Sequence, residues 1–202
     1  MLPPNSRPIC FARAVTGSGT RCSHDYCKKY IPHEHYNEFR NDVQNYYINN
    51  GAWNNTVAKS TEKDLHCTKN VSIYPPTKKI PGTVPTIGLL NRKYSRHVNN
   101  MPELLQSLRK EVPYARIKMM DFDSGCSLPA TAYLMQDIDL FISPFGNAIG
   151  DNIFQRSNRV TISLSSRWYD EDWFQWPSTG MGRRIYNFPC NRADCQVKDY
   201  EL

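Results

Sequence analysis

Basic and small residues follow two short apolar runs of this sequence in an arrangement that suits phosphate binding. The run 86–90 is followed by a loop that holds Arg92 and Arg96, with a lysine between them. The run 139–143 leads into a segment, 143–152, that is rich in small residues and contains two glycines. Guanidinium groups bind phosphate oxygens through paired hydrogen bonds, and the free amides at a helix start attract anions. If both segments lie at one edge of a sheet, they predict a site for a phosphorylated ligand.

The pattern around these segments predicts alternating strands and helices. We expect strands at 86–90, 116–120, 139–143 and 159–164, separated by helices at 100–112, 128–136 and 148–157. Strands separated by helices of about ten residues pair in parallel through right-handed crossovers. The predicted fold class is therefore α/β, a Rossmann-like parallel sheet with helices on both faces. Ligands bind outside the carboxyl ends of such strands. The alternative is that the two arginines are solvated loop residues.

Three regions are predicted along the chain. Residues 1–85 form an irregular lead-in that carries cysteines and glycosylation sequons and contains one helix, expected over 35–50. Residues 86–165 form the layered, ligand-binding region. Residues 166–202 form an aromatic and acidic segment and a tail, in which the periodicity is lost. The aromatic side chains of 168–176 either pack against the sheet, which we favour, or stack on a sugar or base.

Sequons and cysteines indicate an oxidising compartment. Asn54, in Asn-Asn-Thr, and Asn70, in Asn-Val-Ser, are acceptors for N-glycosylation, and the chain has seven cysteines. We therefore expect the lumen of the secretory pathway, in the Golgi or the endoplasmic reticulum. The sequence has no apolar run that suits a membrane helix or a signal peptide. We therefore expect a fragment of a longer protein, or a truncated product.

The cysteines are expected to form disulfides rather than a metal site. Pairing of Cys22 with Cys27, or of Cys190 with Cys195, would close a small loop. Cys126, inside the layered region, is expected to be a plain buried thiol. A zinc site built from Cys22, Cys27 and nearby histidines is the alternative, but their spacing follows no common zinc-finger pattern.

The charged residues favour an anionic small ligand over a metal ion or a nucleic acid. Asp121-Phe122-Asp123 has the form in which metal-dependent transferases hold a cation on nucleotide phosphates. Because it follows a predicted strand and precedes Ser124-Gly125, we favour a role in a turn and predict no metal cofactor. The net charge of +6 is modest and scattered, so it does not indicate nucleic-acid binding, and it suits an anionic small ligand.

Two stretches of the sequence resemble a known family. They read Arg92-x-x-x-Arg96-x-Val98-x-Asn100 and Asp137-x-Asp139-Leu-Phe-Ile-Ser-Pro-Phe-Gly146-Asn-Ala-Ile-Gly-Asp-Asn-Ile-Phe154. They resemble the C-terminal half of family-61 glycosyltransferases, which carries R-x-x-x-R-x-I-x-N and, later, a strand followed by H-G-A-G-L-T-N-x-x-F. Cys10-Phe11 with the following Val15-x-Gly17 also resembles the lead-in to that half.

The resemblance implies the donor-binding half of a GT-B enzyme, a fold of two Rossmann-like halves that face a cleft. Such an enzyme transfers xylose, arabinose or N-acetylglucosamine from a UDP-sugar to a glycan or protein acceptor. Transfer proceeds with inversion and generally without a metal cofactor. The donor-binding residues that it implies here are Arg92, Arg96, Ser143, Gly146, Asn147, Asp151 and Asn152. Asp151 and Asn152 would either fix the loop or bind the ribose or base.

The sequence departs from the family pattern at several positions. Phe145 stands where the family usually has histidine, and Asp151 stands where it has asparagine. Phenylalanine cannot donate a hydrogen bond or take a proton. The strand 160–164 also lacks a glutamate that the family tends to carry, and no catalytic base is assigned. We expect the chain alone to bind the donor weakly and to transfer nothing. A catalytically degenerate binding module is the alternative function.

Overall fold

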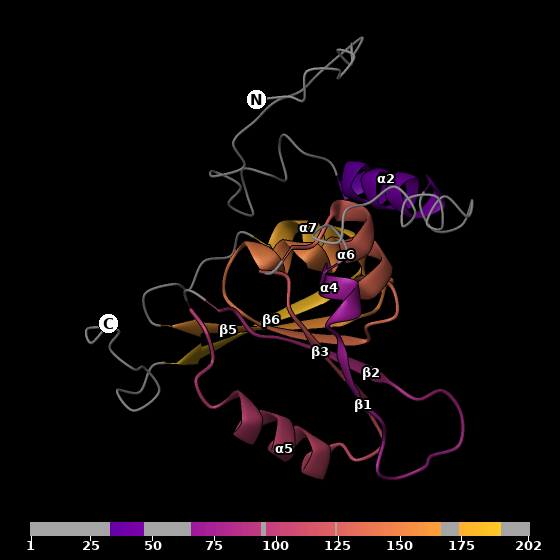
Figure 1. Ribbon diagram of the computed structural model, residues 1–202. Helices are drawn as coiled ribbons and strands as arrows, with labels where there is room; N and C mark the ends of the chain where they lie inside the picture. Colours follow the sequence, from indigo (N-terminus) through magenta and orange to yellow (C-terminus); the bar gives the residue numbers. More distant parts are fainter. Residues whose placement is uncertain (1–32, 47–65, 94–95, 124, 167–173, 191–202) are drawn as a thin grey trace.

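The computed structural model describes residues 33–46, 66–93, 96–123, 125–166 and 174–190. These residues form a six-stranded sheet with helices on both faces (Figure 1), which confirms the predicted Rossmann-like α/β class. None of the described helices is long and apolar enough to cross a bilayer.

The sheet is parallel except at one edge. Its strands are β1 (Ser72–Tyr74), β2 (Thr86–Leu90), β3 (Arg116–Met120), β4 (Leu140–Pro144), β5 (Val160–Ser166) and β6 (Arg184–Cys190). Their order in the sheet is β1-β3-β2-β4-β5-β6. All neighbours pair in parallel except β1, which runs antiparallel to β3. The carboxyl ends of β3, β2 and β4 therefore lie next to one another, on the side of the sheet that we call its carboxyl edge.

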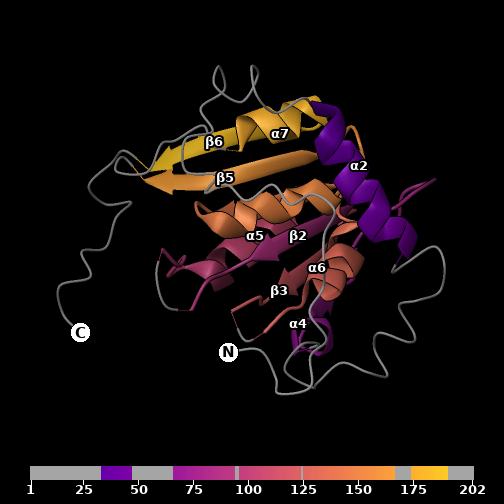
Figure 2. The same ribbon diagram turned by 90° about the horizontal axis from the view of Figure 1, so that it is seen from above.

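Helices cover the two faces unequally. Among the described helices, only α5 (Met101–Glu111) covers one face (Figure 1). On the other face lie α2 (His33–Gln44), α4 (His66–Lys69), α6 (Leu128–Met135), the 3₁₀ helix η3 (Asn147–Phe154) and α7 (Gln175–Gly180). Viewed from that side, α2 passes beside α6 and α7 (Figure 2).

Alternation along the strands divides the core into two clusters. Leu89 and Ile117 pack with the apolar side of α5. Leu90, Met120 and Phe141 pack with α6 and η3 on the opposite face. Every residue of β2 is buried, because this central strand is covered on both sides. Gly88 lets neighbouring side chains close over β2, since a Cβ there would lie 2.8 Å from Cε of Met120.

The four predicted strands are present, with end shifts of at most two residues, and the other differences have local causes. The third predicted helix, 148–157, is the shorter η3. The helix expected over 35–50 spans His33–Gln44, and residues 47–50 lie outside the described residues. The sheet also extends beyond 86–165, because β1 and β6 add a strand at each edge. The sequence did not predict β6, because this segment contains a proline and an asparagine, which are rare in strands. The strand tolerates both because it lies at the edge of the sheet.

Cys126 is not a free thiol, and that prediction was wrong. It forms a disulfide with Cys67, at a Cα–Cα distance of 5.3 Å and a sequence separation of 59. The amide of Cys67 also donates to the carbonyl of Gly125, so α4 is tied to the loop before α6. Cys67, the partner of Cys126, precedes the region 86–165 in the sequence, and the spacing of the cysteines did not indicate this pair. Cys190 is also disulfide-bonded, whereas Cys22, Cys27 and Cys195 lie outside the described residues.

Candidate functional site

Two arginines and a glycine meet where β2 and β4 end. A Cβ atom on Gly146 would lie 2.8 Å from Nη1 of Arg92 and 3.3 Å from Cζ of Arg96. Both guanidinium groups therefore pack against the backbone at the start of η3. The structure thus brings together three of the residues that the sequence singled out for phosphate binding.

Asn91 shapes the loop that carries the arginines. Its Oδ1 accepts hydrogen bonds from the amides of Arg92 (2.9 Å) and Val98 (2.8 Å), and its Nδ2 donates to the carbonyl of Val98 (3.1 Å). These bonds close the loop, and Arg96 has a left-handed backbone with φ of 52°. Sequence analysis missed this role. An asparagine at a strand exit was the available signal, because its side chain can bond to nearby backbone groups.

The acidic pair after β3 contacts the same loop. Oδ2 of Asp123 accepts from the amide of Lys93 at 2.7 Å, and Oδ2 of Asp121 lies 2.6 Å from Nζ of Lys93. Within the described parts of the chain, no three His, Cys, Asp or Glu residues are grouped so as to hold a metal ion. Both carboxylates hold Lys93, and with it the loop that carries the arginines.

Arg92 carries an unused hydrogen-bond donor. Its Nη1 is buried and has no hydrogen-bond partner in the described structure. A buried donor without a partner is rare, and on a permanent cation it favours an anionic ligand. Gly146 is itself buried, and its φ of 152° together with the packed guanidinium groups leaves no room for a side chain. Local charge and shape at this point therefore suit an oxyanion.

Three other predicted residues differ in their accessibility. Asn147, the first residue of η3, is exposed beside Gly146. Ser143 is fully buried in β4, and its hydroxyl donates to the carbonyl of Pro144 at 3.0 Å. Asn152 is also buried, and its Nδ2 donates to Oγ of Ser178 at 2.7 Å. Asn152 thus fixes η3 against α7, which is one of the two roles expected for it.

At Asp151 and Phe145 the sequence departs from the family pattern, and burial affects both residues. Burial raises the pKa of Asp151 to about 7, so its carboxyl group can gain or lose a proton near neutral pH. Phe145 is buried, and its ring meets that of Phe174 edge-on, with 6.2 Å between the ring centres. Its amide donates to the carbonyl of Leu164, which continues the pairing of β4 with β5. Phe145 thus serves packing.

A pocket of about 260 Å³ opens at the carboxyl ends of β2 and β3. It is lined by Asn70, Asn91, Arg92, Lys93, Met119, Met120 and Asp121. Asn70 comes from the lead-in before the sheet, where sequence analysis gave it only a role as a sequon. It is exposed, and its Nδ2 donates to the carbonyl of His66 at 2.9 Å. The other sequon, at Asn54, lies outside the described residues.

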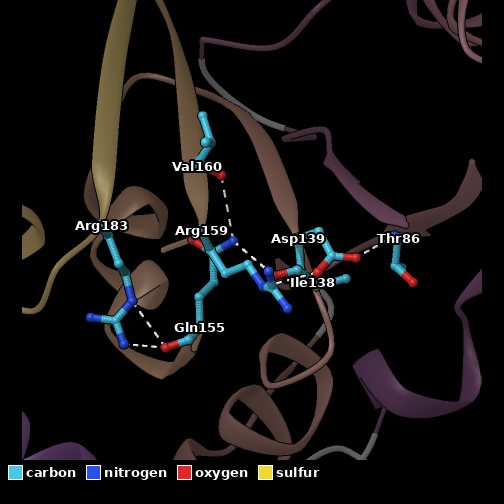
Figure 3. A network of polar contacts seen from close by, with 7 residues as sticks. All are labelled: Thr86, Ile138, Asp139, Gln155, Arg159, Val160 and Arg183. Atoms are coloured by element: carbon cyan, nitrogen blue, oxygen red, sulfur yellow. Dashed lines mark hydrogen bonds and ion pairs between the residues drawn. The ribbon is translucent and has the colours of Figure 1, made fainter. Parts of the chain in front are cut away.

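The opposite side of the sheet, where the parallel strands begin and which we call the amino edge, holds a network of hydrogen bonds and one ion pair (Figure 3). Asp139 accepts from the amide of Thr86 at 2.7 Å and pairs with Nε of Arg159 at 2.9 Å. Arg183 donates to the backbone carbonyls of Ile153 and Gln155, at the end of η3. These contacts join the amino ends of several strands and involve no residue of the pocket.

Comparison with known proteins identifies the family. The family model described as Glycosyltransferase 61 matches residues 10–162, which is more than half of the chain. The matched range contains the arginine loop, the pocket and Gly146. No individual curated protein matches the sequence. This chain therefore belongs to glycosyltransferase family 61, and it is a glycosyltransferase that uses a sugar donor and a glycan acceptor.

Proposed function

We propose that the chain supplies the donor site of an inverting glycosyltransferase and binds a UDP-sugar at the carboxyl edge of its sheet. The donated sugar would be xylose, arabinose or N-acetylglucosamine, and the acceptor a glycan or a protein. The observation that carries this proposal is the meeting of Arg92, Arg96 and Gly146 around a buried guanidinium nitrogen that has no hydrogen-bond partner among the described residues. In the GT-B arrangement, this sheet would form the donor-binding half.

The chemistry of the leaving group explains why these residues are suited to the task. As UDP departs, negative charge builds on its β-phosphate, and preorganised positive groups stabilise that charge. Arg92 and Arg96 would supply guanidinium groups, and the amides after Gly146 would add the field of a helix start. Two guanidinium groups reduce the need for a cation, so we propose that no metal cofactor is required.

A donor-binding measurement tests this proposal directly. Titration calorimetry of the chain with UDP is expected to show binding, and Arg92→Ala is expected to weaken it by about tenfold or more. The matched control is Arg116→Ala, an exposed arginine at the amino end of β3. The proposal fails if UDP does not bind, or if both variants bind it as well as the wild type does.

A catalytically degenerate module that binds a glycan or a protein partner, and not the donor, is the second candidate function. Phe145 favours it, because a phenylalanine that packs on Phe174 cannot polarise a donor as a histidine would. The two functions differ in saturation-transfer NMR with UDP-sugars. A donor signal that Arg92→Ala or Arg96→Ala abolishes would support the transferase. The absence of a donor signal would support the module.

We also propose that the protein acts in the lumen of the secretory pathway and is glycosylated at Asn54 and Asn70. The disulfide between Cys67 and Cys126 supports an oxidising compartment. Expression in a secreting host, followed by endoglycosidase treatment and mass spectrometry, tests both points. An unmodified, fully reduced product from that host would contradict them.

A further inference from the structure

The pocket beside Arg92 adjoins the proposed phosphate site on the side of β3. Arg92 belongs to both places, because its Nη1 packs on Gly146 and the residue also lines the pocket. In the sheet, β2 lies between β4, which ends near Gly146, and β3, which supplies Met119 and Met120. A ligand whose phosphate lies at Gly146 can therefore extend over the end of β2 into the pocket.

Asn70 has hydrogen-bonding capacity that the fold leaves unused. One of its two Nδ2 hydrogens is donated to the carbonyl of His66. No hydrogen bond joins its second hydrogen or its Oδ1 to another described residue. Asn91, the other amide of the pocket, uses both of its polar atoms to close the arginine loop. Asn70 is therefore the amide of this pocket that is able to bind a ligand.

The walls and size of the pocket suit a nucleoside. A volume of about 260 Å³ is small for a whole nucleotide sugar but adequate for one part of it. Met119 and Met120, at the end of β3, contribute the apolar part of the lining. Asp121 and Lys93 add polar groups at the same opening. An apolar wall with a few convergent polar groups is typical of sites for small cofactors and bases.

We propose that this pocket holds the uridine of the donor and that Asn70 hydrogen-bonds to the edge of the uracil ring. This inference rests on the proposed binding of a UDP-sugar. Uracil presents an N–H between two carbonyl groups, so an amide that offers one acceptor and one donor can bond to it twice. Asn70 provides this pair, through Oδ1 and the second hydrogen of Nδ2.

The same residue links ligand binding to glycosylation. Asn70 with Val71 and Ser72 forms a sequon, so its Nδ2 is also the atom to which an N-glycan would be attached. Attachment replaces the hydrogen that uracil needs and places a sugar at the opening of the pocket. A copy of the protein that is glycosylated at Asn70 therefore cannot bind uridine in this pocket, and the proposed donor binding belongs to copies that are not modified there.

Calorimetry with two ligands tests the inference on the whole chain, made in a host that forms disulfides but does not glycosylate. Pyrophosphate reports on the arginine site alone, and UDP reports on the arginine site and the pocket together. UDP is expected to bind about tenfold more tightly than pyrophosphate, and Asn70→Leu to remove that advantage without weakening pyrophosphate. Ser72→Ala, which destroys the sequon but keeps Asn70, is expected to bind both as the wild type does.

The outcomes separate this inference from the proposed function. If UDP binds no tighter than pyrophosphate, or if Asn70→Leu keeps the advantage of UDP, uridine does not occupy the pocket, yet the arginine site stands. If neither ligand binds, the donor site itself is wrong and the inference falls with it. Unchanged pyrophosphate binding by Asn70→Leu also shows that the variant is folded.

Discussion

The two edges of the parallel sheet both carry arginines, but they use them differently. At the amino edge, Arg159 pairs with Asp139, which also accepts from the backbone of Thr86 (Figure 3). At the carboxyl edge, Arg92 packs on Gly146 with its Nη1 unpartnered among the described residues. A paired arginine holds strands together, whereas an unpaired one next to bare backbone keeps its capacity for an anion.

Accessibility separates a functional arginine from a structural one where pairing alone does not. Arg183 at the amino edge also has an unpartnered Nη1, but the residue is only 3% exposed. Its other donors reach the carbonyls at the end of η3, so a ligand has no access to it. Arg92 is only partly buried and lines a pocket. Position beside a pocket therefore distinguishes the two cases.

Removal of Arg183 should produce the largest effect, and on stability alone. Arg183→Ala leaves the carbonyls of Ile153 and Gln155 without their donor and opens a cavity, so we expect a loss of about 3 kcal/mol in the free energy of unfolding. Urea denaturation measures it, with the exposed neighbour Arg184→Ala as the control. UDP affinity of the folded variant should stay unchanged. A loss of affinity with intact stability would place Arg183 in the site.

Gly146→Ala should abolish most of the binding at the carboxyl edge. The new Cβ would lie 2.8 Å from Nη1 of Arg92 and would displace both guanidinium groups. We expect a loss of about a hundredfold in UDP affinity by calorimetry. Gly82→Ala is the matched control, because Gly82 also has a positive φ, of 87°, but a Cβ there meets nothing within 4 Å. Gly82→Ala therefore carries the backbone strain of a positive φ without the clash. Equal UDP affinities in the two would contradict the site.

Asp151 should make the stability of the protein depend on pH. Its pKa in the folded state is about 7, above the ordinary value of 3.8, because burial disfavours the carboxylate. Between these two pH values the folded state holds a proton that the unfolded state has released, so stability falls as pH rises. We expect a fall of about 2 kcal/mol from pH 4 to 7, after allowance for partial exposure.

Thermal unfolding at several pH values measures this slope. Asp151→Asn should flatten it, whereas Asp42→Asn, on the exposed side of α2, should leave it as in the wild type. A stability that rises over this pH range in the wild type, or an unchanged slope in Asp151→Asn, would contradict the assignment. The result would show whether a carboxyl group within η3 exchanges protons at neutral pH.

The fold was predictable where the local pattern and the tertiary structure agree. The run 86–90 is largely apolar because β2 is central and covered on both faces. This composition predicted both the strand and its bounds. In β6, exposed and partly buried side chains alternate only as far as Phe188, and the strand continues through an exposed Pro189. Only pairing with β5 makes this segment a strand, and that pairing is not visible in its own sequence.

The site was predictable in part for a similar reason. Arg92, Arg96 and Gly146 were found because parallel strands place their carboxyl ends side by side. Asn70 and the Cys67–Cys126 disulfide were missed because they join the lead-in to the sheet over a long separation in sequence. Residue type alone gave no sign that Asn152 is a buried brace, since asparagine serves both roles.

The smallest expected effect completes the comparison between the two edges. Arg159→Gln breaks the ion pair with Asp139, whose side chain is 27% exposed beside an Arg159 side chain that is 34% exposed. Because solvent screens such a pair, we expect a loss of about 1 kcal/mol in stability or less. UDP affinity should not change, because the amino edge has no part in the site. Arg92→Gln, the same substitution at the carboxyl edge, should lower UDP affinity and leave stability nearly unchanged. If the two variants instead affect binding equally, the arginines act through the net charge of the protein, and the contact with Gly146 is not what selects the ligand.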